Sequence, residues 1–160
     1  MMKCLDTAQL RALSAEAADH PRRRRNYNLH ASAADPVQRM LNAFEPGTYI
    51  RPHRHRDKWE LFVILSGRAD VLTFDDDGRL AARAALDATE GTRVIEIAQG
   101  AWHSLVSHAP QTVMFEVKQG PYVPTAPEDF ASWAPPEGDA ATRECEQWFR
   151  TATPGSHLKR

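Results

Sequence analysis

The chain has 160 residues, a hydrophobic fraction of 42%, a charged fraction of 26% and a formal net charge of −1. This length suits a single domain with one core, and the composition is ordinary for a globular protein. A net charge near zero provides no overall attraction to nucleic acid or to anionic membranes, so we expect neither as a partner. The two cysteines do not indicate a disulfide framework, no apolar run has membrane-spanning length, and the N-terminus lacks the apolar core of a signal peptide. We therefore expect a cytoplasmic protein.

The first 21 residues predict an N-terminal helical segment. Asp6 or Thr7 can cap a helix that runs to about Ala18, and Pro21 ends it. Leucine and alanine residues fall on one side of this helix at helical spacing. We expect the helix to be peripheral or to belong to a dimer contact.

Four consecutive arginines, Arg22–Arg25, follow this segment. Such a run is typical of nucleic-acid patches, but the chain has no second basic cluster, which favours a solvated turn. A third interpretation is that one arginine binds an anionic substrate, because guanidinium groups bind carboxylate and phosphate in a bidentate way.

Residues Asn26–His30 alternate between polar and apolar side chains, as expected of a short strand. Asn28 and His30 share one face of this strand, which lies either in a cavity or in solvent. Asn28 is therefore a candidate for a substrate contact. His30 is a candidate for a substrate contact or a catalytic base, because an imidazole titrates near neutral pH.

A helix is predicted for the next segment. Asp35 can cap it and Pro36 suits its first position, and the apolar side chains of residues 37–44 follow helical spacing. This short helix would pack one side on the domain. Arg39 lies off that side and is a candidate for binding substrate.

The stretch Gly47–Gly67 carries the strongest chemical signal. His53 and His55 are two residues apart, so on a strand both imidazoles point to the same face. A polar turn follows, and Glu60 begins the apolar run Leu61–Leu65, which reads as the next strand. Two imidazoles and a carboxylate that converge from adjacent strands predict a site for a divalent transition metal.

Further strands are expected over Ala69–Phe74, Leu80–Leu86, Val94–Ile97 and Thr112–Lys118. In the last strand, Glu116 and Lys118 share one face with a methionine, and the other face is apolar and suits the core between the sheets. Glu116 and Lys118 then either face water or line the cavity, where they would form an acid/base unit.

Two more features concern the ends of this region. Arg51 has the same strand parity as the two histidines, so it either lines the cavity mouth or is exposed. Residues 121–160 are rich in proline and contain a final helix that Asp139 can cap, and we expect this arm and helix to pack on the domain.

The pattern Gly, five residues, His53, one residue, His55, four residues, Glu60, six residues, Gly67 resembles the first motif of the cupin superfamily. Gly100-Ala101-Trp102-His103 resembles the second motif, although Ala98 replaces the usual proline and Ser107 the usual asparagine. The resemblance implies an all-β fold, a cupin double-stranded β-helix or jelly-roll barrel over residues 22–120 with short flanking helices. It also implies His103 as a fourth metal ligand beside His53, His55 and Glu60.

The chain is similar more specifically to the WbuC-type cupin fold metalloproteins, which are bacterial proteins encoded among O-antigen genes. The similarity rests on these segments: Arg25–His30, Asp35–Ala43, Pro52–His55, Lys58–Glu60, Gly100–His103 and Gly120–Tyr122. It implies a metal-binding barrel with a link to lipopolysaccharide sugar metabolism, a homodimer of the kind common among cupins, and Tyr122 as a further candidate for a substrate contact.

Two classes of function fit these residues. In a metalloenzyme, three imidazoles and a carboxylate would hold iron, manganese, nickel or zinc and leave positions open for a small, sugar-like substrate or for dioxygen. An isomerase or epimerase would need a base, for which Glu116 and His30 are candidates, and a dioxygenase would need a redox-active metal. The alternative is a non-catalytic module that binds or senses sugars through the metal. An ionisable group beyond the ligands, within reach of the metal, would favour the enzyme.

Overall fold

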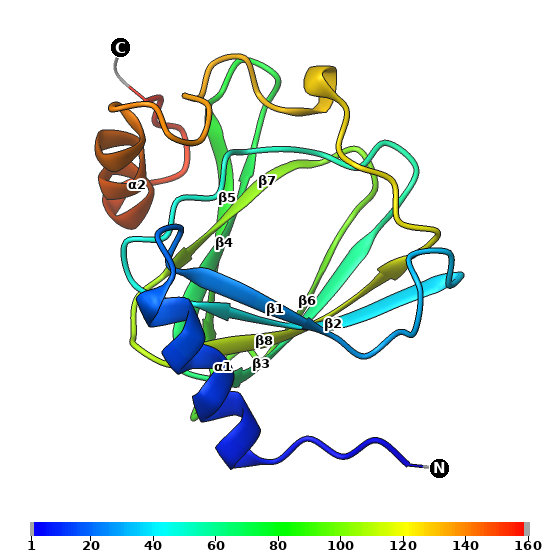
Figure 1. The fold of residues 1–160 in the computed structure, drawn as a ribbon. Helices are drawn as coiled ribbons and strands as arrows, with labels where there is room; N and C mark the ends of the chain where they lie inside the picture. Colours follow the sequence, from blue (N-terminus) through cyan, green and yellow to red (C-terminus); the bar gives the residue numbers. More distant parts are fainter. Residues whose placement is uncertain (1, 159–160) are drawn as a thin grey trace.

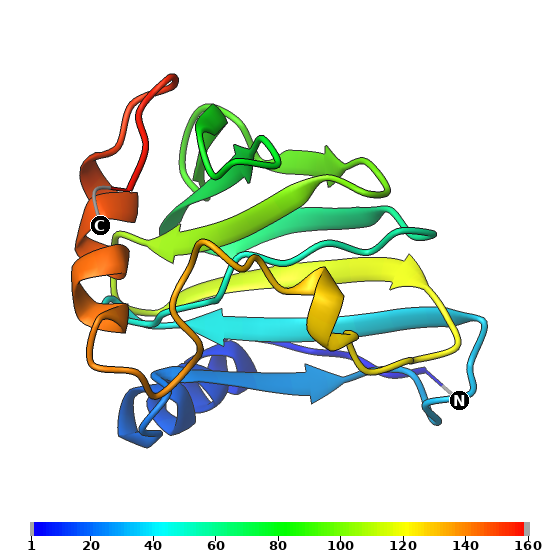
Figure 2. The same ribbon diagram turned by 90° about the horizontal axis from the view of Figure 1, so that it is seen from above.

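Two antiparallel sheets face each other in the computed structural model, which describes residues 2–158 (Figures 1 and 2). The five-stranded sheet has the order β1-β2-β8-β3-β6, and the three-stranded sheet has the order β5-β4-β7. The elements are α1 (Thr7–Asp19), β1 (Arg24–Asn28), β2 (Val37–Phe44), β3 (Glu60–Ser66), β4 (Arg68–Phe74), β5 (Leu80–Asp87), β6 (Val94–Ile97), β7 (Trp102–Ser107), β8 (Thr112–Gln119), the 3-10 helix η1 (Pro127–Asp129) and α2 (Thr142–Thr151). No helix among residues 2–158 is long and apolar enough to cross a membrane.

The core between the sheets comes from alternate side chains of the central strands. Phe62 and Ile64 of β3, Val71 of β4, Leu105 of β7 and Met114 of β8 are buried in one cluster. Each of these strands has hydrogen-bonded neighbours, so its backbone groups are satisfied while one face is apolar. This apolar part fills one end of the space between the sheets and leaves the other end to polar side chains.

The helix predicted over residues 36–44 is wrong, because Val37–Phe44 forms strand β2. β2 pairs with β1 on one side and with β8 on the other, so it is an interior strand. Its last four residues are buried on both faces, Leu41 and Ala43 beneath α1 and Asn42 and Phe44 towards the opposite sheet. Burial on both faces hides the period of two from the sequence, and the Asp35-Pro36 signal then favoured a helix.

Helix α1 covers the outer face of the five-stranded sheet (Figure 1). Asp6, one of the two predicted caps, caps it and also forms a capping box with Gln9. Leu13 and Ala17 pack on Val113 and other apolar side chains of β2 and β8. The apolar face of β8 therefore lies under α1 and not between the sheets, which corrects the predicted assignment of its two faces.

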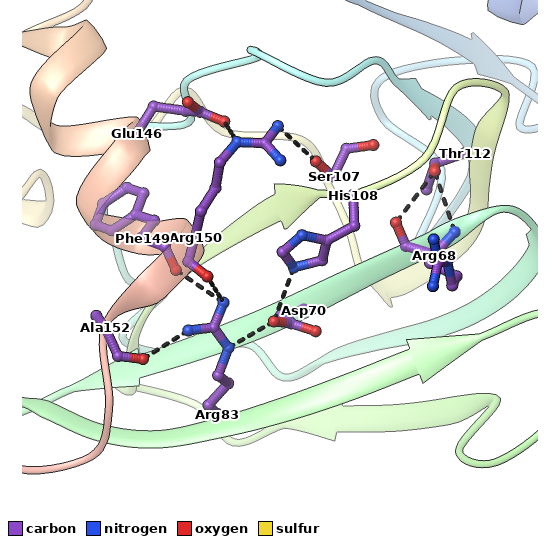
Figure 3. Close-up of polar contacts among 10 residues, drawn as sticks. All are labelled: Arg68, Asp70, Arg83, Ser107, His108, Thr112, Glu146, Phe149, Arg150 and Ala152. Atoms are coloured by element: carbon purple, nitrogen blue, oxygen red, sulfur yellow. Dashed lines mark hydrogen bonds and ion pairs between the residues drawn. The ribbon is translucent and has the colours of Figure 1, made fainter.

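Helix α2 packs against the three-stranded sheet and is held there by polar contacts (Figure 3). Arg83 of β5 donates hydrogen bonds to the carbonyl oxygens of Phe149 (2.9 Å) and Ala152 (2.6 Å) at the end of the helix, and to Asp70 Oδ2 (2.5 Å). A cation at these carbonyls satisfies groups that a helix terminus leaves unpaired. The helix starts at Thr142 with Ala141 as its N-cap, so the predicted cap at Asp139 is wrong.

Candidate metal centre and its cavity

A loop and a strand end bring the histidines together. The predicted strand around the first two histidines is wrong, since among the described residues between β2 and β3 only His53 takes part in isolated bridges, with His103 and Phe130. His53 N donates to His103 O at 3.1 Å, and His103 N donates to His53 O at 2.9 Å. Gly100 N also donates to His55 O at 2.6 Å. These backbone bonds fix both segments that carry imidazoles relative to each other.

Four side chains meet at this point, three from the first motif and His103 from the second. One ligand atom from each of His53, His55, Glu60 and His103 lies within 4.8 Å of the others. Glu60 is the first residue of β3 and His103 is the second residue of β7, so the cluster joins the two sheets at one end of the barrel.

Second contacts orient two of the imidazoles. His53 Nδ1 lies 3.0 Å from Arg51 O, and His103 Nδ1 lies 2.9 Å from Ala101 O. A carbonyl oxygen can only accept, so each Nδ1 carries the proton and each Nε2 presents a lone pair to the cluster. This second contact is the usual way in which a metal-binding histidine is held in the required tautomer.

The remaining contacts in the cluster do not satisfy its nitrogens. His55 Nε2 lies 3.0 Å from Glu60 Oε1, and His103 Nε2 lies 2.9 Å from Glu60 Oε2. Both nitrogens are buried, and despite these short distances neither is aligned for a hydrogen bond. Buried polar atoms are rarely left unpaired without a cause, and lone pairs that converge on one point are satisfied by a cation. The buried His/Glu cluster therefore could bind a metal ion.

The protonation states suit a cation as well. Burial is the main cause that lowers the pKa of His53 to about 3, so its imidazole is neutral. Burial raises the pKa of Glu60, but the nearby imidazoles of His103 and His55 and the charge of Lys118 outweigh it and hold this pKa well below its usual value. Neutral imidazole and ionised carboxylate are the ligand forms that a divalent metal requires.

A buried acid–base pair adjoins the cluster. Lys118 Nζ lies 2.8 Å from Glu60 Oε1 and 2.8 Å from Glu116 Oε1, and Asn42 Nδ2 donates to Glu116 Oε2 at 2.6 Å. Burial and the charge of Glu60 raise the pKa of Glu116 despite the cation beside it. Burial lowers the pKa of Lys118, but the two carboxylates raise it by more, so the ammonium group stays charged. The pair faces the cavity, the second of the two placements left open by the sequence.

A cavity of about 670 Å³ extends from the cluster along the inner face of the five-stranded sheet. Among the predicted site residues, its walls include Asn28, His30, His53, Glu60, His103, Glu116, Lys118 and Tyr122. Ligand sites commonly have this size. The ring of His30 is buried, and its Nδ1 accepts a hydrogen bond from Arg39 N at 3.0 Å and lies 2.9 Å from Arg39 O.

Two predicted substrate contacts lie elsewhere. Arg51 donates from Nη2 to Ala131 O at 2.8 Å and lines a different hollow beside the C-terminal arm. Arg39 is about half exposed on the opposite side of β2 and lies 3.6 Å from Asp35. Neither belongs to the walls of the large cavity. Both side chains had been placed by strand or helix positions that the structure replaces.

Sequence reasoning missed several residues of the cavity wall. Gln38 and Asn42 point inward from β2, and Arg22, Arg24 and Arg25 lie at its far end. A period of two over residues 38–44 would have found the first two. Only the third interpretation of the arginine run anticipated the others.

A family model described as a domain of unknown function, DUF6016, matches residues 5–86, which is more than half of the chain. The chain belongs to this family. No curated protein sequence matches it. The DUF6016 match covers α1, β1–β4 and β5 up to Leu86, and with them three of the four residues of the cluster.

Solved structures are similar to the DUF6016 chain in fold. CapF with an inhibitor gives a TM-score of 0.53 at 19% identity over 62% of this chain, which spans only 28% of CapF. KdgF from Halomonas sp. gives 0.51 at 13% identity over 66% of this chain and 85% of that one. An uncharacterized protein with a double-stranded β-helix domain from Klebsiella pneumoniae subsp. pneumoniae gives 0.50 at 14% identity, over 64% and 82%. The predicted cupin double-stranded β-helix is confirmed, and identities this low show the fold alone.

Proposed function

We propose that the protein holds one divalent transition metal through His53, His55, Glu60 and His103 and acts as a metalloenzyme on a small, sugar-like substrate. The observation that carries this proposal is the pair of buried Nε2 atoms, on His55 and His103, that have no hydrogen-bond partner and lie beside a carboxylate. Three imidazoles and one carboxylate suit iron, manganese, nickel or zinc. When bound, such an ion supplies Lewis acidity to an oxygen of the substrate.

The residues around the cluster support an enzyme over a binding module. Glu116 is buried, its pKa is raised, and Asn42 fixes one of its oxygens. A carboxyl with a raised pKa can take a proton from a substrate carbon or oxygen and return it near neutral pH. Lys118 holds the other oxygen of Glu116 and also contacts Glu60, so the proton-transfer group and the ligand set are one connected unit. His30, buried in the same wall, is the second candidate base.

The biological setting rests on the similarity to the WbuC-type proteins. It supports a role in lipopolysaccharide or O-antigen sugar metabolism, in which keto-sugars and nucleotide sugars are the compounds to screen. The homodimer has the same support, and analytical ultracentrifugation would measure it.

The decisive experiment is metal analysis of protein purified without added metal. We expect about one transition-metal ion per chain, and His55→Ala should weaken metal affinity by more than tenfold. His157→Ala is the control, because it also removes one imidazole but from a half-exposed site remote from the cluster. If His55→Ala retains the metal as the wild type does, the proposed centre is wrong.

A second variant separates catalysis from binding. Glu116→Gln keeps the size of the side chain and removes its acid–base function, so turnover should fall by at least a hundredfold while the metal content is unchanged. Metal-dependent binding of a sugar without any turnover in the wild type would replace the enzyme by a sensing module. A redox-inert metal without dioxygen uptake would exclude a dioxygenase.

A further inference from the structure

The far end of the cavity carries the arginines that the metal cluster does not need. Arg22, Arg24 and Arg25, which we call the arginine rim, line the same cavity as Glu60 and His103. The described residues of its walls include Arg22, Arg24, Arg25 and Lys118 but only two carboxylates, and both carboxylates lie at the metal end beside Lys118. The rim therefore has an excess of positive charge that the cavity itself does not neutralise.

An internal carboxylate shows what the rim binds. Glu137, on the arm that follows β8, contacts the guanidinium groups of both Arg22 and Arg24, with a distance of 2.8 Å from Arg22 Nη2 to Oε2. Guanidinium groups bind carboxylate and phosphate oxygens in this forked way. Arg22 is 55% exposed and Glu137 is 37% exposed, and ion pairs with this much exposure contribute little to stability. A ligand with a higher charge can displace Glu137.

The side chain of Arg25 lies on the α1 side of the sheet, because Arg25 is opposite Ala43, which packs beneath α1. Its Nε lies 3.5 Å from Glu16 of α1, beyond the usual length of a charge-assisted hydrogen bond, and its side chain is 47% exposed. Arg24 is more deeply placed and also donates from Nη1 to Tyr49 O at 2.6 Å, which anchors it to the loop before His53. Arg24 thus fixes the rim, while the half-exposed Arg22 can reorient towards a ligand.

The strand register gives the separation between the rim and the metal cluster. Glu60 is opposite Lys118, which is opposite Gln38, whereas Arg24 is opposite Phe44. Arg24 is therefore three strands across and six residues along from Glu60, roughly 14 Å and 20 Å at standard sheet spacings. Even with the curvature of the sheet and the reach of an arginine side chain, a single sugar ring at the cluster cannot contact the rim.

We propose that the substrate of the metal centre is an extended molecule with an oxyanion, a phosphate or carboxylate, at the end remote from the reacting group. The arginine rim binds this oxyanion and Glu137 occupies its place in the free protein. This inference rests on the proposed function for the reacting end, but the rim can be tested without a metal.

The first test measures binding of inorganic pyrophosphate to the full-length protein stripped of metal with EDTA, by calorimetry at fixed low salt. We expect Arg22→Gln to raise the dissociation constant at least tenfold and Glu137→Gln to lower it severalfold. Arg56→Gln is the matched control: it is 57% exposed, it also pairs with a carboxylate, and it lies outside the cavity. Its dissociation constant should stay within twofold of the wild type. Succinate, titrated in parallel, shows whether carboxylate or phosphate is preferred.

Three results would overturn the proposal that the arginine rim binds an oxyanion. They are no binding of either anion, equal weakening by Arg22→Gln and Arg56→Gln, or no gain from Glu137→Gln. Circular dichroism of each variant verifies that it is folded. Because this test uses metal-free protein, a lack of anion binding would refute the rim without bearing on the metal centre. A lack of metal binding would likewise leave the test of anion binding unaffected.

The second test measures where the anion binds. Protein loaded with Mn²⁺ is mixed with pyrophosphate, and the paramagnetic relaxation of its ³¹P nuclei is recorded. Binding at the rim predicts the weak enhancement of a nucleus more than about 10 Å from the ion, given the sheet spacings above. The much stronger enhancement of a phosphate in direct contact with the ion would refute the rim as the binding site.

Discussion

Replacement of Lys118 by methionine tests the connected unit of the cavity most directly. Lys118 Nζ lies 2.8 Å from an oxygen of Glu60 and 2.8 Å from an oxygen of Glu116. At an effective dielectric constant of about 20, each contact corresponds to an attraction of roughly 6 kcal/mol, much of which is offset by the cost of removing the ammonium from water. Loss of one partner from a buried ionic group has a net cost of about 3–5 kcal/mol. We expect the free energy of unfolding of the metal-free protein to fall by this amount at pH 8.

The destabilisation of Lys118→Met should depend on pH and on bound metal, whereas that of a simple packing defect would depend on neither. The raised pKa of Glu116 rises further without the cation, so Glu116 binds a proton in the folded variant as the pH falls. The loss should therefore be smaller at pH 5.5 than at pH 8. A divalent ion would replace the missing positive charge, so added metal should stabilise Lys118→Met more than the wild type.

Urea unfolding at both pH values, with EDTA and with metal, measures these effects. Lys58→Met is the matched control, since Lys58 donates to Pro121 O at the surface and its loss should change the free energy of unfolding by less than about 1 kcal/mol. Two results would contradict a buried ion-pair role for Lys118. One is a free energy of unfolding for Lys118→Met within about 1 kcal/mol of the wild type at pH 8 in EDTA, and the other is a destabilisation as large at pH 5.5 as at pH 8.

The remaining predictions concern stability and reactivity. His53 has a pKa of about 3 in the folded protein against 6.5 in the unfolded chain, so the unfolded state takes up a proton first as the pH falls. The free energy of unfolding of the metal-free protein should then fall by up to about 1.4 kcal/mol per pH unit below pH 6.5, and His53→Gln should reduce this slope in urea titrations. A Cβ on Gly67 (φ +74°) would lie 2.6 Å from the backbone of β8, whereas one on Gly91 (φ +83°) meets nothing within 4 Å. Gly91→Ala should cost about 1–2 kcal/mol for its backbone conformation, and Gly67→Ala about 1–3 kcal/mol more for the clash; equal thermal shifts would contradict this account. Burial raises the pKa of Cys145 to about 12 while Cys4 is exposed. A thiol reagent at pH 8 should therefore modify one cysteine per chain in the native protein and two after denaturation. Two equivalents in the native state would show that Cys145 is accessible.

The local spacing of residues predicted the convergence of His53, His55 and Glu60 better than it predicted the elements that carry them. His53 and His55 converge as two residues on one strand would, although the segment forms only isolated bridges. Backbone bonds to His103 and Gly100 supply the order that a regular strand would have given. The spacing was informative because it constrains the ligand positions. The long-range hydrogen bonds that hold the loop leave no local pattern in the sequence.

Where a strand was predicted correctly, the error lay in the assignment of its two faces. β8 was predicted at nearly its observed bounds, yet its apolar face was placed between the sheets, where Met114, Glu116 and Lys118 actually point. The covering of the outer face by α1 makes both faces of β8 buried, so hydrophobicity alone does not identify the inner one. The same cause concealed β2 and with it Asn42, the partner of Glu116.

The distribution of charge along the cavity determines which substrates the two ends can accept together. At the metal end, Lys118 already balances one of the carboxylates of Glu60 and Glu116, so a bound divalent ion would leave this end positive. At the other end, the arginine rim is balanced only by half-exposed or distant carboxylates. A neutral sugar would satisfy neither excess, whereas a molecule with an oxyanion at one end and oxygen ligands at the other would satisfy both. Its direction in the cavity would then be set by competition between the two sites, and Glu137 is the residue that adjusts this competition by weakening the rim. Glu137→Gln should therefore increase the affinity for extended anions and leave the affinity for neutral sugars unchanged, and an equal effect on both in calorimetry would show that Glu137 does not act by competing with the oxyanion for the rim.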